Sequence, residues 1–296
     1  MQIYDHIPDE FADDVALCIG KFDGFHRGHR LLLEEAKRTD CPVTVLTFVF
    51  NRTETIDSAS EKRRIAESLG VDYYVEIHAG TDFFSLTPEA FIGDVVKNKL
   101  HARHVIVGED FRFGHERAGD IKTLQSMSET YDYELHVIPK MQDDGTDISS
   151  SRIRACIAAG RMDETERLLG RNYRIEGTVS GGNHIGRRMG VPTANLVPDP
   201  DKVLPPRGVY AVRVRIDGDD AEYGGIGNLG VKPTVGPDNP VGFEVHLFDT
   251  EENLYNRTLS VSILTFLREE RQFQSMEELN RKIESDIEDA KRRLEI

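Results

Sequence analysis

Residues 15–36 read VALCIGKFDGFHRGHRLLLEEA, which joins a short apolar run to a glycine-rich turn and then to a helical pattern. We expect the run at 15–19 to be a strand. Leu31, Leu32 and Ala36 recur at helical spacing and predict one apolar helix face. A strand that meets a helix through glycines is typical of α/β proteins that bind nucleotides, because ligands bind outside the carboxyl ends of the strands.

The rest of the first half repeats this alternation of strand and helix. Helices are predicted over 61–69, where Gly70 ends the helix, and from Thr87-Pro88, an N-cap followed by proline, to about residue 100. A further helix starts near residue 119. Strands are predicted at 43–48, 72–77, 104–107 and 134–138. This alternation predicts a Rossmann-like parallel sheet that is covered on both faces.

The second half has a different pattern. Strand-like runs without long helices between them predict an antiparallel β-barrel, and they lie at 173–179, 208–216, 222–226, 242–248 and 258–266. Ser275 and Glu278 form a capping-box pattern before a final amphipathic helix. Its apolar face is made of Met276, Leu279, Ile283, Ile287, Ala290 and Leu294. We expect this face to pack against the barrel.

Composition narrows the classes of function. The formal net charge of −15 disfavours a general nucleic-acid binder, although a local pocket on an acidic protein can still hold a nucleotide. No apolar run approaches the roughly 20 residues that span a bilayer. The first 12 residues do not resemble a signal peptide, and three widely spaced cysteines favour free thiols. These features predict a cytoplasmic protein without a membrane, nucleic-acid or obligate protein partner.

The turn at residues 20–29 has the chemistry of a phosphate site. Its glycines permit a tight turn and a close approach of the backbone to phosphate, and the helix that follows offers free N–H groups. His26 and His29 are placed to donate hydrogen bonds to a triphosphate and a departing pyrophosphate. Two histidines at this spacing are also compatible with half of a metal site or with a chance surface pair.

Three motifs in this half resemble the bacterial bifunctional riboflavin kinase/FAD synthetase family. The turn at 20–29 is similar to the G-x-F-D-G-x-H-x-G-H signature of the H-x-G-H nucleotidyltransferases. Residues 148–154, ISSSRIR, resemble the family's I-S-S-T-R-I-R, although such a run by itself is more often a helix N-cap. Residues 107–114, VGEDFRFG, resemble its V-G-x-D-F-R-F-G.

The resemblance implies roles for residues of the first domain, in which FMN attacks the α-phosphorus of ATP. His26 and His29 are then catalytic. The implied nucleotide-binding residues are Gly20, Phe22, Asp23, Gly24, Gly28, Ser149, Ser150 and Arg152. The implied flavin-binding residues are Asp110, Phe111 and Arg112. The sequence departs from the family at Asn51-Arg52, where relatives have F-x-P-H-P, and at His115, where many have lysine.

Residues 186–195, GRRMGVPTAN, are similar to the riboflavin kinase signature G-R-x-x-G-x-P-T-A-N. The resemblance implies that Gly186, Arg187, Gly190 and Pro192 bind nucleotide. Thr193 and Asn195 offer neutral oxygen ligands, which suit a Mg²⁺ ion that rides on nucleotide phosphates. Read by itself, P-T-A-N would more often be an ordinary turn and strand start.

Further matches follow at residues 206–210, 227–234 and 244–249. Glu244 is implied to be the base that acts on the ribityl hydroxyl, and Arg268 to bind flavin. Period-2 alternation places Glu244 and His246 on one face of a strand, where His246 supports the site without acting in the chemistry. Without the resemblance, Glu244 would be taken for a solvated strand carboxylate.

The resemblance implies a bifunctional enzyme. Residues 1–170 would adenylate FMN to FAD, and residues 171–296 would phosphorylate riboflavin to FMN, with ATP as substrate and Mg²⁺ as cofactor. Three alternatives stay open from the sequence. They are a kinase with an impaired first domain, an adenylyltransferase for another nucleotide, and a flavin-binding regulator or carrier without turnover.

Overall fold

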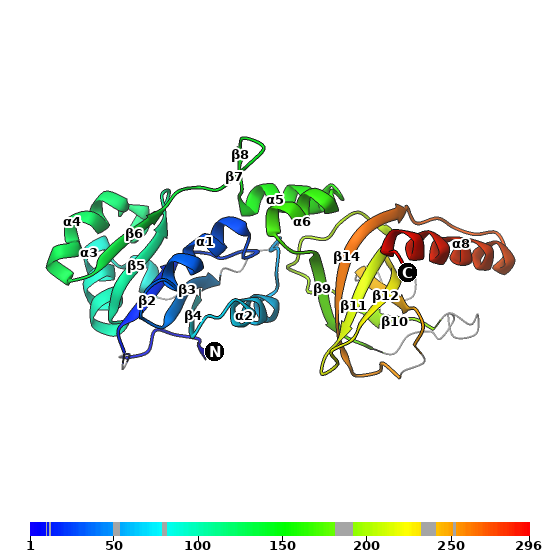
Figure 1. Ribbon diagram of the computed structural model, residues 1–296, viewed down its shortest axis with the longest axis horizontal. Helices are drawn as coiled ribbons and strands as arrows, with labels where there is room; N and C mark the ends of the chain where they lie inside the picture. The colour runs from blue at the N-terminus through cyan, green and yellow to red at the C-terminus, as the bar shows by residue number, and fades with distance from the viewer. Residues whose placement is uncertain are drawn as a thin grey trace. The chain divides into compact units, whose positions relative to one another are not determined.

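The computed structural model is shown in Figure 1, and it describes residues 1–9, 11, 13–49, 54–78, 82–180, 192–231, 241–250 and 253–296. Contacts divide the chain into two compact units, Met1–Ser150 and Ser151–Ile296. The limits that we expect from the sequence, 1–170 and 171–296, stay a prediction. Among the helices that the structure describes, none is both long enough and apolar enough to span a bilayer.

The first unit is built on a parallel sheet of six strands in the order β1-β4-β3-β2-β5-β6. The strands are β1 (Gln2–Tyr4), β2 (Val15–Ile19), β3 (Val43–Val49), β4 (Tyr73–His78), β5 (Ala102–Gly108) and β6 (Glu134–Ile138). All five pairings between neighbours are parallel. The chain moves outward from β2 to β4 and then returns to β5 beside β2, so the strand order reverses between β2 and β5. The prediction of a Rossmann-like parallel sheet is confirmed.

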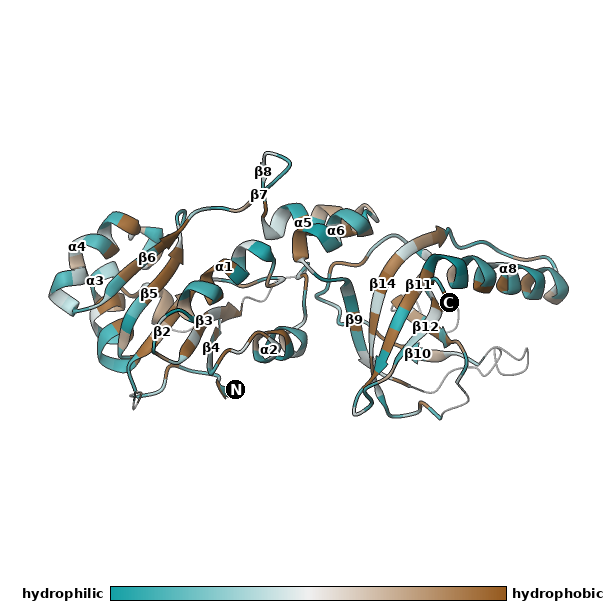
Figure 2. Ribbon diagram, viewed as in Figure 1, coloured by the Kyte–Doolittle hydropathy of each residue, from teal (hydrophilic) through white to brown (hydrophobic). Residues whose placement is uncertain are grey.

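Two apolar clusters lie on the two faces of this sheet. Alternate residues of β2 enter different clusters, because successive strand side chains point to opposite faces. One face is covered by α1 (Arg27–Ala36) and α2 (Ala59–Ser68). The other is covered by the π-helix η2 (Phe91–Lys99), which continues the short helix α3 (Pro88–Ala90), and by α4 (Ile121–Tyr131). Figure 2 shows the apolar strands between more polar helices.

The helix start at Thr87-Pro88 is confirmed, whereas α2 begins at Ala59, two residues before the predicted start. The Thr87 hydroxyl accepts a hydrogen bond from the N–H of Ala90, and Pro88 is the first helical residue. In α1 the buried leucines are Leu32 and Leu33, whereas Leu31 is only half-buried. Leu33 lies three residues before Ala36 and shares its face of the helix, whereas Leu31 lies two residues before Leu33 and points away from that face.

The second unit contains helices α5 (Ser150–Ala158) and α6 (Met162–Leu169), an antiparallel sheet and a final helix. The sheet has the order β10-β13-β12-β11-β14-β9. Its strands are β9 (Tyr173–Thr178), β10 (Ala194–Leu196), β11 (Gly208–Ile216), β12 (Glu222–Val231), β13 (Val241–Leu247) and β14 (Thr258–Arg268). An antiparallel bridge between Ser180 and Asn195 joins the two edges, so the sheet curls into a barrel-like form.

The last helix, α8 (Met276–Leu294), packs on β11, β12 and β14 as predicted. Ala290 and Leu294 are buried against Ala211 and Phe248. The apolar face is only partly covered, since Met276 keeps 50% of its surface exposed. The Ser275 hydroxyl accepts from the N–H of Glu278, but the Glu278 carboxylate accepts from the N–H of Gln274 and not of Ser275. The reciprocal bond of the capping box is therefore made to the residue before the N-cap.

Candidate active sites

The turn after β2 leads directly into α1 at the carboxyl edge of the parallel sheet. It lies beside β5, where the strand order reverses, which is the position at which sheets of this kind bind ligands. Phe22 and Phe25 adopt positive φ angles of 46° and 40° and are fully buried. Their rings stack with centroids 5.2 Å apart. This packing holds the turn in a backbone conformation that such residues rarely adopt.

His26 is the N-cap of α1. Its Nδ1 accepts a hydrogen bond from the backbone N–H of His29 at 3.3 Å. Glycine at position 28 lets the His26 ring pack closely on the backbone, because a Cβ there would make a tight contact of 3.3 Å with the ring. Burial lowers the pKa of His26 to about 4. At neutral pH the ring is therefore uncharged, and since Nδ1 accepts, the proton is on Nε2, which can donate to a ligand.

The His29 ring stacks on the His26 ring, with centroids 3.6 Å apart and planes at 17°. Burial, together with the neighbouring His26 and Lys62, holds the pKa of His29 well below its usual range. Its Nδ1 is buried and has no hydrogen-bond partner among the described residues. A buried polar atom without a partner is costly, so it marks a position at which a ligand would complete the site.

Lys62, which the sequence analysis did not identify, is a buried cation next to this turn. Its Nζ lies 3.2 Å from the carbonyl oxygen of Lys21 and 3.4 Å from the Thr47 hydroxyl. Burial lowers its pKa, while the charges of Asp23, Glu76 and Asp57 raise it. Its helical spacing in α2 resembles that of any surface lysine, so no signal in the sequence distinguishes it.

Asp23 ties the turn to two other segments. Its Oδ1 accepts from the N–H of Ile56 at 2.8 Å, and its backbone carbonyl accepts from the Ser150 hydroxyl at 2.8 Å. The predicted phosphate ligand Ser150 therefore lies at this turn, with its proton donated to the loop. Ser149 directly precedes it. The Arg152 guanidinium donates to Glu164 at 3.0 Å. That these three residues bind phosphate stays a prediction.

The three residues predicted to bind flavin follow β5, on the strand adjacent to β2. Asp110 pairs with Lys140 at 3.2 Å, and Arg112 pairs with Asp120 at 3.1 Å. The Phe111 ring stacks on Phe113 at 5.5 Å. Because β2 and β5 are parallel neighbours, this segment and the H-x-G-H turn emerge at the same edge of the sheet.

In the second unit, the strand register places three polar residues in one row. Asn195 of β10 pairs with Glu244 of β13, and Glu244 pairs with Asn228 of β12. Residues directly opposite in antiparallel strands share a face of the sheet. The Phe243 and Val245 side chains are buried, whereas Glu244 is half-buried, which agrees with the predicted alternation.

A hydrogen bond made by another residue of β13 holds this row of polar residues in place. His246 donates from Nδ1 to the carbonyl oxygen of Pro192 at 2.8 Å, because a carbonyl can only accept. Together with the Asn195–Glu244 pair, this bond brackets Thr193 between two attachments to β13. His246 therefore orients the P-T-A-N segment, which is the supporting position expected for it.

Arg268, predicted to bind flavin, is engaged with α8. Its guanidinium contacts the buried Asp286 carboxylate at 2.8 Å through Nε and at 2.7 Å through the terminal nitrogen. Asp286 also pairs with Lys282 at 2.9 Å. The sequence did not indicate this pair, which links two segments 18 residues apart. Five candidate residues, Asn51, Arg52, Gly186, Arg187 and Gly190, lie outside the described residues.

The first unit has a capped helix at the point where the strand order of its parallel sheet reverses. The second unit has a curled antiparallel sheet with a carboxylate between two amides. Together these features define a two-domain transferase that uses nucleotides. Comparisons with known proteins agree with this class. Residues 9–152 match the FAD synthetase family, and residues 169–294 match the riboflavin kinase family.

Full-length relatives show the same combination. The bifunctional riboflavin kinase/FMN adenylyltransferase of Escherichia coli (strain K12) is 37% identical over 283 residues, which cover 91% of this chain and 90% of that protein. The enzyme of the same description from Haemophilus influenzae is 33% identical and covers 97% of this chain and 96% of its own. The chain belongs to the bifunctional riboflavin kinase/FMN adenylyltransferase family.

A solved structure extends the likeness to three dimensions. A crystal structure described as a macrolide-efflux protein from Streptococcus pneumoniae matches with a TM-score of 0.85 and 28% sequence identity. The match covers 97% of this chain and 98% of that one. Both units therefore have a counterpart in one solved chain.

Proposed function

We propose that the second domain transfers the γ-phosphate of ATP to riboflavin, and that the first domain joins the resulting FMN to AMP from a second ATP. The observation that supports this best is the row of Asn195, Glu244 and Asn228 across three strands. It brings a carboxylate and two amides together, although Asn195 and Asn228 lie 33 residues apart in the sequence. The family matches support both activities, because one half of the chain matches the FAD synthetase family and the other matches the riboflavin kinase family.

In the kinase reaction, Glu244 accepts the proton of the ribityl 5′-hydroxyl as its oxygen attacks the γ-phosphorus. The bond between the γ-phosphorus and the bridging oxygen breaks, and ADP leaves. Glu244 fits this role because it is half-buried on the polar face of β13 beside two amides. His246 keeps the P-T-A-N segment against the same strand.

Mg²⁺ fits the residues present. Asn195 is buried, with 6% of its surface exposed, on β10, and Thr193 is held two residues before it. Both offer neutral oxygens, which suit a hydrated Mg²⁺ that is bound mainly by nucleotide phosphates. We propose that these two residues hold the ion and that, when bound, it neutralises phosphate charge.

In the adenylyltransferase reaction, an FMN phosphate oxygen attacks the α-phosphorus of ATP, and pyrophosphate leaves. The neutral His26 ring donates a hydrogen bond from Nε2 to the phosphates. His29 Nδ1, which has no partner among the described residues, forms a hydrogen bond with the ligand. The buried Lys62 adds positive charge behind the turn. A cytoplasmic location, expected from the composition, stays part of this proposal.

The experiment compares two variants in two assays. Glu244→Gln keeps the shape of the side chain but removes the base, so FMN formation from riboflavin is expected to fall at least about 100-fold. FAD formation from supplied FMN should be unchanged. His29→Ala is the reciprocal variant, which should lose FAD formation and keep FMN formation. If either variant loses both activities equally while remaining folded by circular dichroism, the division between the domains is wrong.

A further inference from the structure

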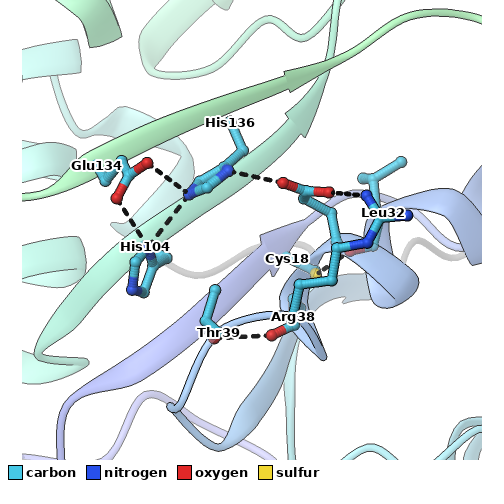
Figure 3. A network of polar contacts seen from close by, with 9 residues as sticks. Cys18, Leu32, Arg38, Thr39, His104, Glu134 and His136 are labelled. Carbon is cyan, nitrogen blue, oxygen red and sulfur yellow. Dashed lines mark hydrogen bonds and ion pairs between the residues drawn. The ribbon is translucent and has the colours of Figure 1, made fainter.

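A second pair of histidines lies in the first unit, away from the H-x-G-H turn. His104 is on β5, and Glu134 and His136 are on the edge strand β6. His104 Nδ1 and His136 Nε2 are 3.1 Å apart. His104 Nδ1 lies 3.6 Å from Oε2 of Glu134, and His136 Nε2 lies 3.6 Å from its Oε1. Figure 3 shows the three side chains converging on one point. One ligand atom from each lies within 4.8 Å of the others.

The strand register explains why these side chains meet. His104 pairs directly with Glu134, and His136 follows two residues later on the same face of β6. This is the face covered by α1, since Ile106, two residues after His104, belongs to the cluster that contains the α1 leucines. Each imidazole retains only 16% of its side-chain surface, whereas Glu134 retains 66%. The cluster is therefore partly buried but accessible from one side.

A second carboxylate fixes the tautomer of His136. Its Nδ1 lies 3.1 Å from Glu35 Oε1 on α1. The other oxygen of this carboxylate accepts a hydrogen bond from Arg38 at 2.6 Å, so both oxygens of Glu35 act as acceptors. His136 thus donates from Nδ1, and Nε2 presents a lone pair toward His104 and Glu134. Histidines that bind metals commonly donate their second nitrogen to a carboxylate in this way.

The spacing matches a small tetrahedral site. With metal–nitrogen bonds of about 2.0–2.1 Å, two ligand atoms of a tetrahedral zinc ion lie about 3.3 Å apart. The observed separations of 3.1 and 3.6 Å bracket that value. Two imidazoles and one carboxylate are suitable ligands for Zn²⁺, and they leave its fourth position open.

We propose that His104, Glu134 and His136 form a binding site for a divalent transition-metal ion of the Zn²⁺ type, with Glu35 orienting His136. The site lies in the amino-terminal part of β5 and at the start of β6, whereas the H-x-G-H turn leaves the carboxyl end of β2. Because the strands are parallel, the amino-terminal ends of β5 and β6 and the carboxyl end of β2 lie at opposite ends of the strands. The bound ion therefore links β5 to β6, and through Glu35 to the last turn of α1, without entering the adenylyltransferase site.

Calorimetric titration of the full-length, chelator-treated protein with Zn²⁺ tests this site. The wild type should bind one ion at this site. His104→Ala and Glu134→Gln should weaken that binding by more than about tenfold, and Glu35→Ala by roughly 10–100-fold. Glu134 is largely exposed, so Glu134→Gln keeps the fold intact. Binding that is equally strong in the wild type and in these variants would overturn the proposal.

Two control variants separate this site from other histidines. His6→Ala removes an exposed histidine that also contacts a carboxylate, Asp5, and His29→Ala removes one ring of the stacked His26–His29 pair. Both should bind Zn²⁺ as the wild type does. X-ray absorption of the protein loaded with one equivalent of Zn²⁺ should show two imidazole ligands. A spectrum with no imidazole, or binding that is lost only in a control variant, would place the ion elsewhere.

Discussion

At the scale of single residues, His26 combines two roles that depend on its charge state. The neutral ring accepts the N–H of His29 through Nδ1 and keeps a proton on Nε2 for a ligand. Protonation of Nδ1 would destroy the cap and bring a positive charge into a buried position next to His29. The same burial that makes the ring a neutral donor therefore makes the turn sensitive to acid.

This sensitivity predicts a pH dependence of stability. The pKa of His26 falls from 6.5 to about 4 on folding, so the unfolded chain binds more protons between these values. The stabilisation is fully present above about pH 6.5 and is lost as the pH falls toward 4, with a total of roughly 3 kcal/mol. Urea unfolding followed by circular dichroism at several pH values measures it.

The matched variant is His26→Asn, whose amide oxygen can still cap α1 but does not titrate. The free energy of unfolding of the wild type should fall relative to this variant as the pH decreases from 7 to 4. Parallel curves for the two proteins would show that His26 is not held neutral by burial.

At the scale of elements, the start of α2 is fixed by a reciprocal cap. The Ser58 hydroxyl accepts from the N–H of Glu61 at 3.2 Å, and the Glu61 carboxylate accepts from the N–H of Ser58 at 2.7 Å. Ser58→Ala should lower the free energy of unfolding by about 1 kcal/mol. Ser68→Ala, near the end of the same helix, should change it by less than about 0.5 kcal/mol. Equal effects in thermal unfolding would contradict this account of the helix start.

The final helix depends on one buried carboxylate. Asp286, with 2% of its surface exposed, contacts both Arg268 and Lys282. Asp286→Ala leaves the Arg268 guanidinium without its carboxylate partner and should cost about 2–3 kcal/mol in urea unfolding. Asp289→Ala removes an exposed pair with Arg292 on the same helix and should cost less than about 0.5 kcal/mol. A larger loss in Asp289→Ala would refute this explanation.

These elements also show what the sequence could predict. Local signals were sufficient for the Thr87-Pro88 helix start and for the alternation of Glu244 and His246, because each depends on neighbours within a few residues. The run of three leucines at 31–33 does not show which of them face the core, so Leu31 was chosen in place of Leu33. A shift of one residue rotates a helix face by about 100°.

Long-range contacts were out of reach of the same reasoning. The burial of Lys62 depends on the carbonyl of Lys21 and on Thr47 of another strand. The pair of Arg268 with Asp286 and the cluster of His104 with residues of β6 likewise depend on tertiary packing. No spacing in the sequence distinguishes these side chains from exposed ones of the same type.

At the scale of the whole molecule, one chain combines two kinds of sheet, each suited to a different phosphate transfer. The parallel sheet supplies a helix N-terminus with neutral imidazole donors, which suits a reaction without a protein nucleophile. The antiparallel sheet places a carboxylate in a row with two amides, and the base that we propose this carboxylate to be suits phosphorylation of an alcohol. The full-length relatives of the same family match both halves of this chain.

The most direct test of the two-activity account is chromatography of the flavins formed by the purified chain with ATP and Mg²⁺. Riboflavin should give both FMN and FAD, and supplied FMN should give FAD. That result would also show that Asn51-Arg52 is tolerated in place of the family's F-x-P-H-P. Formation of FMN alone, with no FAD even from supplied FMN, would contradict the account and leave the chain as a riboflavin kinase with an inactive first domain.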